Sequence, residues 1–133
     1  MIALDTNVLL RFFLRDDEAQ TEAAEKLLRQ LTLKEPGFVC REVLVELVRV
    51  LDRYYHFDRD QIAGVLNELV VVAAVEIECA SDVAEAAGGY RRGGADFADR
   101  MIAAAARRAG AVPLYTFDRK AARLSGVTLV ESG

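Results

Sequence analysis

Four carboxylates occupy positions where an α/β protein commonly holds its chemistry, namely Asp5, Glu46, Asp99 and Asp118. Asp5 and Asp118 follow short apolar segments that are predicted to be strands, whereas Glu46 and Asp99 lie on largely apolar helical segments. If the four side chains converge, a divalent cation has to offset their repulsion, and oxygen ligands without Cys or His favour Mg²⁺ or Mn²⁺. Such a site suggests hydrolysis of a phosphodiester bond by water.

Several of these acidic residues also have a purely structural interpretation. Asp5 and Asp118 are suited to cap the helices that follow them, and Asp96 is the best candidate for a cap alone. Glu46 can form an exposed pair with Arg49 or Arg53, because the three residues share one face of a helix. What favours a site over these separate roles is their joint placement on strand ends and apolar helices.

The elements that must position these side chains are short strands alternating with helices. Apolar segments predict strands at 2–4, 38–40, 74–78, 112–117 and 127–130. Helical spacing and caps predict helices at 6–14, from 16 or 17 to about 31, at 41–55, 58–70, from 81 to about 87, at 96–109 and 119–124. The glycine-rich segment 88–94 is expected to be a flexible loop. This alternation predicts a parallel sheet covered on both faces, with ligands beyond the carboxyl ends of its strands.

Composition limits the class of protein. The 133 residues are about one domain's worth, and 53% apolar residues exclude a disordered chain, so we expect one domain over 1–133. A net charge of −4 argues against a protein that coats nucleic acid by bulk charge. The longest apolar run, 69–75, is too short to span a bilayer, and two unspaced cysteines suggest a reducing compartment. We therefore expect a soluble cytoplasmic protein.

Four motifs taken together resemble the PIN domain family, and most closely its small bacterial toxins of the VapC type. They are residues 4–10 (LDTNVLL), 42–47 (EVLVEL), 96–103 (DFADRMIA) and 116–118 (TFD). Their order and approximate spacing match over essentially the whole chain. The resemblance implies a three-layer α/β/α fold with a central five-stranded parallel sheet. It also implies a Mg²⁺- or Mn²⁺-dependent endoribonuclease.

The resemblance further implies which residues form the site. Asp5, Glu46, Asp99 and Asp118 would be the acidic metal ligands and catalytic residues, with Asp96 as a less certain fifth member. Asn7 and Thr116 match neighbours that hydrogen-bond the carboxylates in that family. An RNA substrate, a homodimer and a cognate antitoxin that blocks the site are the partners it implies.

Three arginines are candidate substrate contacts. Arg91 and Arg92 lie just ahead of Asp96 and are placed to contact the RNA backbone. Arg100 is a departure from the family pattern, because relatives commonly carry a small residue directly after Asp99. A contact with a substrate phosphate and a pair with an acidic residue both remain open for Arg100.

Other interpretations are less favoured. A catalytic triad would have to use His56, the single histidine, which lies among aromatic residues at a helix end. Phe12, Phe13 and Leu14 suit a dimer or antitoxin surface as well as they suit core packing. The main alternative to a nuclease is a catalytically inactive PIN-like module that binds RNA or protein, as the net negative charge would allow. A receiver-type signalling domain ranks last, since no aspartate ends the third strand.

Overall fold

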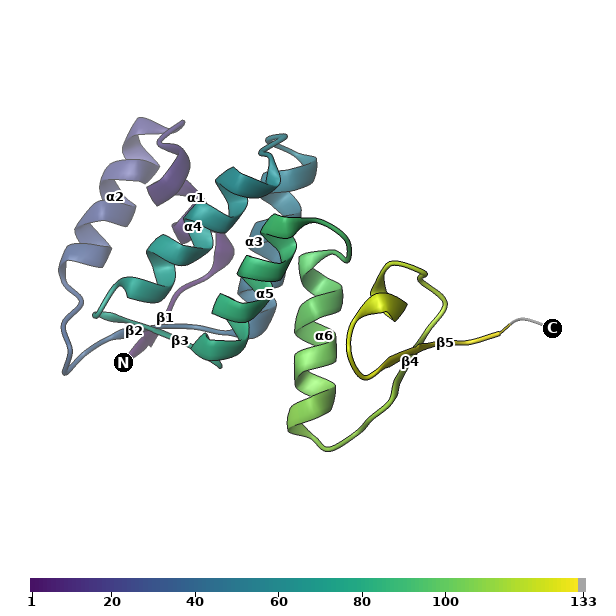
Figure 1. Ribbon diagram of the computed structural model, residues 1–133. Helices are drawn as coiled ribbons and strands as arrows, with labels where there is room; N and C mark the ends of the chain where they lie inside the picture. Colours follow the sequence, from purple (N-terminus) through teal and green to yellow (C-terminus); the bar gives the residue numbers. More distant parts are fainter. Residues whose placement is uncertain (132–133) are drawn as a thin grey trace. The chain divides into compact units, whose positions relative to one another are not determined.

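In the computed structural model, residues 1–131 are described, and they fall into two compact units (Figure 1). The N-terminal unit comprises residues 1–80, and the C-terminal unit begins at Ser81. The predicted single domain over 1–133 stays a prediction, and its last two residues lie outside the described part. No helix in that part is both long and apolar enough to cross a membrane.

The N-terminal unit is a three-stranded parallel sheet with four helices. Its elements are β1 (Ile2–Ala3), α1 (Thr6–Leu14), α2 (Glu18–Arg29), β2 (Gly37–Val39), α3 (Arg41–Arg53), α4 (Arg59–Val71) and β3 (Val75–Ile77). The strand order is β1-β2-β3, with Ala3 opposite Phe38 and Phe38 opposite Glu76. Every strand is separated from the next by at least one helix, which is the connection that parallel pairing requires.

Aspartates begin three helices of this unit. The side chains of Asp5 and Asp17 accept hydrogen bonds from backbone N–H groups in the first turns of α1 and α2. Asp58 forms a complete capping box with Gln61 at the start of α4. These bonds satisfy N–H groups that have no partner inside the helix. The three aspartates therefore determine where α1, α2 and α4 begin.

Large aliphatic side chains fill the interior of the N-terminal unit. α1 packs against α2 and α3, and α3 packs against α4. Leu44, Leu47 and Leu51 on α3 and Ile62 and Leu66 on α4 are completely buried. Burying each such side chain contributes about 1.5–3 kcal/mol, so α3 and α4 are held by their apolar faces rather than by helix propensity.

The C-terminal unit is built from two long helices and a two-stranded parallel ladder. It contains α5 (Ala80–Arg92), which starts at the boundary, α6 (Phe97–Arg108), β4 (Leu114–Thr116), the 3₁₀ helix η1 (Ala121–Arg123) and β5 (Val127–Leu129). Tyr90 and Phe97 are both buried and pack edge to face, with ring centroids 6.4 Å apart. Most other buried side chains of this unit are alanines, which bury less apolar area than leucines.

The parallel α/β architecture is confirmed, but the single five-stranded sheet is not what the strands form. Backbone hydrogen bonds pair β1, β2 and β3 in one sheet, and β4 and β5 in a second one. Alternating strands and helices predict parallel pairing, but they do not determine which strands share a ladder. With only two or three residues in each strand, few hydrogen bonds record the pairing.

The expected flexible loop at 88–94 is wrong over most of its length. α5 continues through Gly88 and Gly89 and ends at Arg92, and only Gly93 and Gly94 leave the helix, with φ angles of 102° and 83°. Two glycines inside a helix cost about 1 kcal/mol each. The absence of a side chain at the buried Gly89 leaves room for the guanidinium group of Arg100, which offsets part of that cost.

Candidate functional site

Asp5 lies between the end of β1 and the start of α1. One carboxylate oxygen, Oδ1, accepts a hydrogen bond of 2.8 Å from the backbone N–H of Thr6, so the predicted cap is confirmed. The residue is exposed, while its neighbours Leu4 and Thr6 are buried. The cap fixes the orientation of the carboxylate and leaves its second oxygen outside the cap.

The polar neighbours of Asp5 make few contacts. Asn7 is exposed on the first turn of α1, and within residues 1–131 it makes no hydrogen bond to a carboxylate. The Thr6 hydroxyl is buried without a hydrogen-bond partner in the described structure. The supporting role of Asn7 therefore stays a prediction.

Glu46 lies on a charged stripe of α3 made of Glu42, Glu46, Arg49 and Arg53, and all four residues are exposed. The opposite face of the helix carries the buried leucines, so the amphipathic pattern predicted from the sequence is confirmed. Over the described residues Glu46 makes no ion pair with either arginine. The surface-pair interpretation is thus not observed, and the carboxylate of Glu46 faces solvent.

Asp96 and Asp99 lie at the start of α6. Asp96 occupies the N-cap position with extended backbone angles, yet its side chain makes no capping hydrogen bond. The pure cap predicted for it is therefore wrong, because its backbone but not its side chain takes the capping role. Asp99 lies three residues further along and is half-buried.

The carboxylates of the C-terminal unit influence one another. Burial raises the pKa of Asp99 above its ordinary value, and the negative charges of Asp118 and Asp96 raise it further. A hydrogen bond from the Asp96 backbone opposes this shift. Negative charge is thus concentrated around Asp99, in a setting where a bound cation would relieve the repulsion.

Asp118 follows β4 at the carboxyl end of the strand. Its Oδ1 accepts a hydrogen bond of 2.9 Å from the backbone N–H of Ala121, the first residue of η1, but Lys120 rather than Asp118 is the N-cap residue of this 3₁₀ helix, which is shorter than the predicted helix at 119–124. Thr116 supports it from the preceding strand, since Thr116 Oγ1 accepts a 3.0 Å hydrogen bond from the Asp118 backbone N–H. Thr116 therefore holds the backbone of Asp118 and does not touch its carboxylate.

Arg100 has a structural role that the sequence did not reveal. Its Nε donates to the Ala95 carbonyl at 3.1 Å, and its Nη2 donates to the Gly93 carbonyl at 2.8 Å. A Cβ atom at Gly89 would lie 2.2 Å from Nη1 of Arg100, so the guanidinium occupies the space that a side chain at Gly89 would need. Arg100 therefore fixes the turn between α5 and α6, directly ahead of Asp96.

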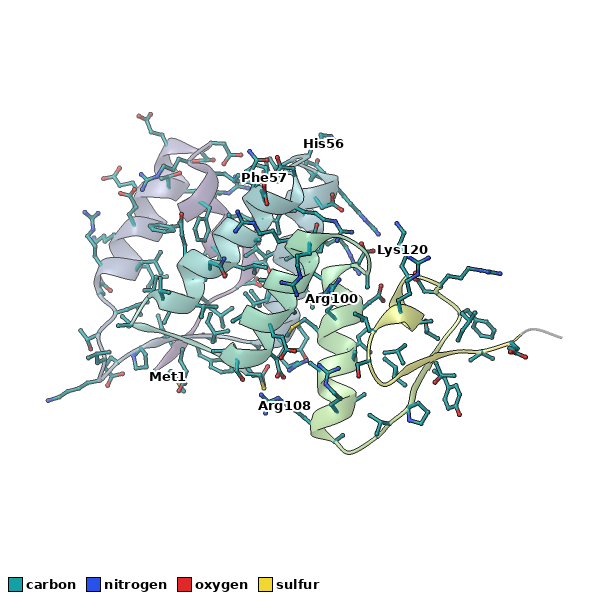
Figure 2. All side chains as sticks on the ribbon, viewed as in Figure 1. Met1, His56, Phe57, Arg100, Arg108 and Lys120 are labelled. Atoms are coloured by element: carbon teal, nitrogen blue, oxygen red, sulfur yellow. The ribbon has the colours of Figure 1, made fainter. Side chains whose placement is uncertain are left out.

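The remaining substrate and partner candidates lie on α5, beyond the end of α3 and on α1. Arg91 and Arg92 are exposed in the last turn of α5, and the substrate contacts predicted for them and for Arg100 stay predictions. His56 is exposed beyond the end of α3 (Figure 2). Phe12 and Phe13 line a mainly apolar cavity of about 350 Å³ in the N-terminal unit. A role for them in a dimer or antitoxin surface stays a prediction.

The candidate metal ligands divide between the two units. Asp5 and Glu46 belong to the N-terminal unit, whereas Asp96, Asp99 and Asp118 belong to the C-terminal unit. Neither unit by itself, over residues 1–131, contains a group of three or more His, Cys, Asp or Glu side chains that could hold a metal ion. Charges influence one another over longer distances than the 2.0–2.6 Å, roughly, of direct coordination. The donor set nevertheless has the chemistry that Mg²⁺ and Mn²⁺ require, since it consists of carboxylate oxygens.

Two comparisons with known proteins relate this chain to others. The family model described as PIN domain matches residues 2–127, which includes all the acidic positions discussed above. A VapC ribonuclease of Aquifex aeolicus (strain VF5) is 30% identical over 130 residues, covering 97% of this chain and 96% of that protein. Both matches run across the two units described here.

Proposed function

Because this chain belongs to the PIN domain family, we propose that it is a divalent-metal-dependent endoribonuclease and the toxin of a type II toxin–antitoxin pair. The observation that carries this proposal is the similarity over nearly the full length of both chains to a VapC ribonuclease. The unfavourable concentration of negative charge around Asp99 supports it, because a cation-binding role explains why such repulsion is retained.

The residues that would hold the ion are Asp5, Glu46, Asp99 and Asp118, with Asp96 as a further donor. Mg²⁺ or Mn²⁺ bound by these carboxylates would supply charge stabilisation at the phosphate and activate water for attack. The hydrolysis proposed leaves a 5′-phosphate and a 3′-hydroxyl.

The chain's own residues would keep these carboxylates in place. Asp5 and Asp118 each use one oxygen to accept a hydrogen bond from a backbone N–H of the following turn, which restricts the rotation of the carboxylate. Thr116 holds the Asp118 backbone, and Arg100 fixes the turn ahead of Asp96. Preorganisation of this kind spares the site the entropy of ordering its ligands when the ion binds.

Partners follow from the same proposal. A toxin of this class would act on RNA as a cytoplasmic homodimer and would be inhibited by a cognate antitoxin protein. The cavity lined by Phe12 and Phe13 supports a role for α1 in such protein contacts, since it is mainly apolar.

A second candidate function is a catalytically inactive PIN-like module that binds RNA or protein. The net charge of −4 favours it, because an acidic protein has little general attraction for RNA. The negative charges of Asp96 and Asp118 around Asp99 argue against it, since a module that only binds RNA gains nothing from the repulsion they cause.

The test is incubation of the purified protein with total bacterial RNA in Mn²⁺, followed by mapping of the new ends. Matched samples contain EDTA or the Asp5→Asn variant, in which the amide oxygen still caps α1. Discrete cuts with 5′-phosphates that vanish in both controls would support the nuclease. Cuts that persist in EDTA or with Asp5→Asn would contradict the proposed site.

A further inference from the structure

The charged stripe of α3 has an acidic half and a basic half. Glu42 and Glu46 lie toward the N-terminus of the helix, and Arg49 and Arg53 lie toward its C-terminus. At 1.5 Å per residue, Arg49 is about 4.5 Å and Arg53 about 10.5 Å beyond Glu46 along the helix axis. The basic half is therefore continuous with a residue proposed to act on the scissile phosphate.

The two arginines of the basic half have exposed side chains. In the described part of the chain Arg49 and Arg53 make no ion pair or hydrogen bond through their side chains. Other arginines of this unit behave differently, since Arg11 pairs with Asp16 and Arg15 pairs with Glu25. Two exposed guanidinium groups without ion-pair partners in the described residues are available on this helix face to contact an anion.

An exposed aromatic ring completes the surface at the end of α3. Tyr54 is 79% exposed, while its neighbour Tyr55 donates a hydrogen bond from its hydroxyl to Asp16. The helix end is fixed by a hydrogen bond from Phe57 N–H to Leu51 C=O, with His56 in the left-handed region at a φ of 57°. Tyr54 follows Arg53 directly in the chain, and its exposed ring lies against the ring of Tyr55, with centroids 5.8 Å apart.

We propose that the basic half of the α3 stripe, Arg49 and Arg53, together with Tyr54, binds a single strand of RNA beside the bond that is cut. This inference rests on the proposed function, and it adds the residues that hold the substrate. Arg49 and Arg53 are one helical turn apart, so they contact neighbouring phosphates of an extended strand. Tyr54 stacks on an unpaired base, which a duplex does not offer.

The chemistry favours RNA over a protein partner on this face. An RNA strand that runs along α3 from a scissile phosphate near Glu46 toward the C-terminus of the helix would bring its flanking phosphates to Arg49 and Arg53. Bidentate phosphate contacts suit guanidinium groups, and stacking on tyrosine is tolerant of sequence.

The experiment measures equilibrium binding of a fluorescein-labelled oligouridylate of about 12 nucleotides in EDTA, over a range of salt concentrations. Variants are Arg49→Ala, Arg53→Ala and Tyr54→Ala in the full chain. Arg29→Ala is the matched control, because Arg29 is also an exposed arginine in the last turn of a helix. Thermal melts verify that each variant is folded.

We expect each arginine variant to weaken binding several-fold and to reduce the slope of log affinity against log salt by about 0.7. Tyr54→Ala is expected to weaken binding about 10-fold without changing that slope. A duplex of the same length should bind no better to the unaltered protein than to Tyr54→Ala.

The inference is overturned if the unaltered protein does not bind the oligonucleotide. It is also overturned if Arg49→Ala and Arg53→Ala match Arg29→Ala in affinity and salt slope, which would leave this face to a protein partner. These outcomes are separate from failure of the nuclease proposal. Absence of RNA cleavage with the binding losses intact would reject the nuclease and keep the RNA surface.

Discussion

The two units hold their acidic residues in different ways. In the N-terminal unit, Asp5 is tied to the first turn of α1 and Glu46 points to solvent from a helix whose other face is completely buried. In the C-terminal unit, Asp99 is half-buried and feels the charges of Asp96 and Asp118. The N-terminal unit therefore exposes its two candidate carboxylates to solvent. The C-terminal unit instead holds Asp99 partly buried and close enough to Asp96 and Asp118 for their charges to raise its pKa.

This difference indicates that the proposed function and the stability of the fold conflict in the C-terminal unit, around Asp99. The N-terminal unit is held by large aliphatic side chains and by aspartate caps on α1, α2 and α4, and the C-terminal unit by many alanines, an aromatic pair and the contacts of Arg100. Functional sites commonly retain interactions that the fold alone would not select. Substitutions of matched residues in the two units should therefore have different, and in places opposite, effects.

The largest effect is expected on RNA cleavage, and substitutions in the two units should lower the cleavage rate equally. Asp5→Asn in one unit and Asp99→Asn in the other should each lower the cleavage rate by about 100-fold or more. Loss of an outer-shell partner of a metal already costs about 10- to 100-fold, and these residues are proposed ligands. Initial rates in Mn²⁺ measure the effect. A variant of either residue that keeps the full rate would remove that residue from the site.

Alanine substitutions of a helical glycine in each unit should change the free energy of unfolding in opposite directions. Gly64→Ala in α4 has open space around it and should raise the free energy of unfolding by about 0.5–1 kcal/mol. Gly89→Ala in α5 should lower it by about 1 kcal/mol, because the loss of two hydrogen bonds from Arg100 exceeds the gain in helix propensity. Urea unfolding of both variants provides the measurement, and equal signs would refute the role given to Arg100.

Helix caps provide a similar contrast of smaller size. Asp58→Ala removes a capping box and should cost about 1 kcal/mol. Asp96→Ala should cost less, because the Asp96 side chain makes no capping bond and its charge raises the pKa of Asp99. Thermal unfolding of the two variants at one pH compares them. An equal or larger loss for Asp96→Ala would show that its side chain is structural.

The smallest effect is the pH dependence of stability. A carboxyl whose folded pKa is raised binds protons more tightly when folded, so its contribution to stability is lost as pH rises through that pKa. Asp99→Asn should consequently melt at a higher temperature than the unaltered protein at pH 7. The two should converge below the ordinary aspartate pKa of about 3.9. Glu46→Gln is the exposed control from the other unit, and a lower melting temperature for Asp99→Asn at pH 7 would contradict this account.

The sequence predicted much of the local structure. α1 spans Thr6–Leu14 as expected, because the Asp5 cap and the apolar spacing are both local signals. The positions of Asp5 and Asp118 at strand ends, and of Glu46 on an exposed stripe, follow from equally local patterns. α5 was mispredicted because the two glycines are unfavourable locally, while the contact that favours one of them comes from Arg100, eleven residues later.

The sequence pattern does not predict contacts between residues that are far apart in the chain. Nothing local distinguishes a strand that joins β1–β3 from one that pairs only with its neighbour, so the division into two ladders was not predictable. The raised pKa of Asp99 depends on its burial and on the positions of Asp118 and Asp96 in space. The family resemblance supplied the acidic set, but geometry of this kind had to come from the structure.

We propose that Asp5, Glu46, Asp99 and Asp118 bind the metal together, and Mn²⁺ titration by calorimetry tests this proposal most directly. The proteins to compare are the unaltered chain, Asp5→Asn, Asp99→Asn and the double variant. We predict that each single variant weakens Mn²⁺ binding at least 10-fold and that the double variant loses less than the sum of the two free energies. Unchanged Mn²⁺ affinity in either single variant, or strictly additive losses, would contradict a shared site.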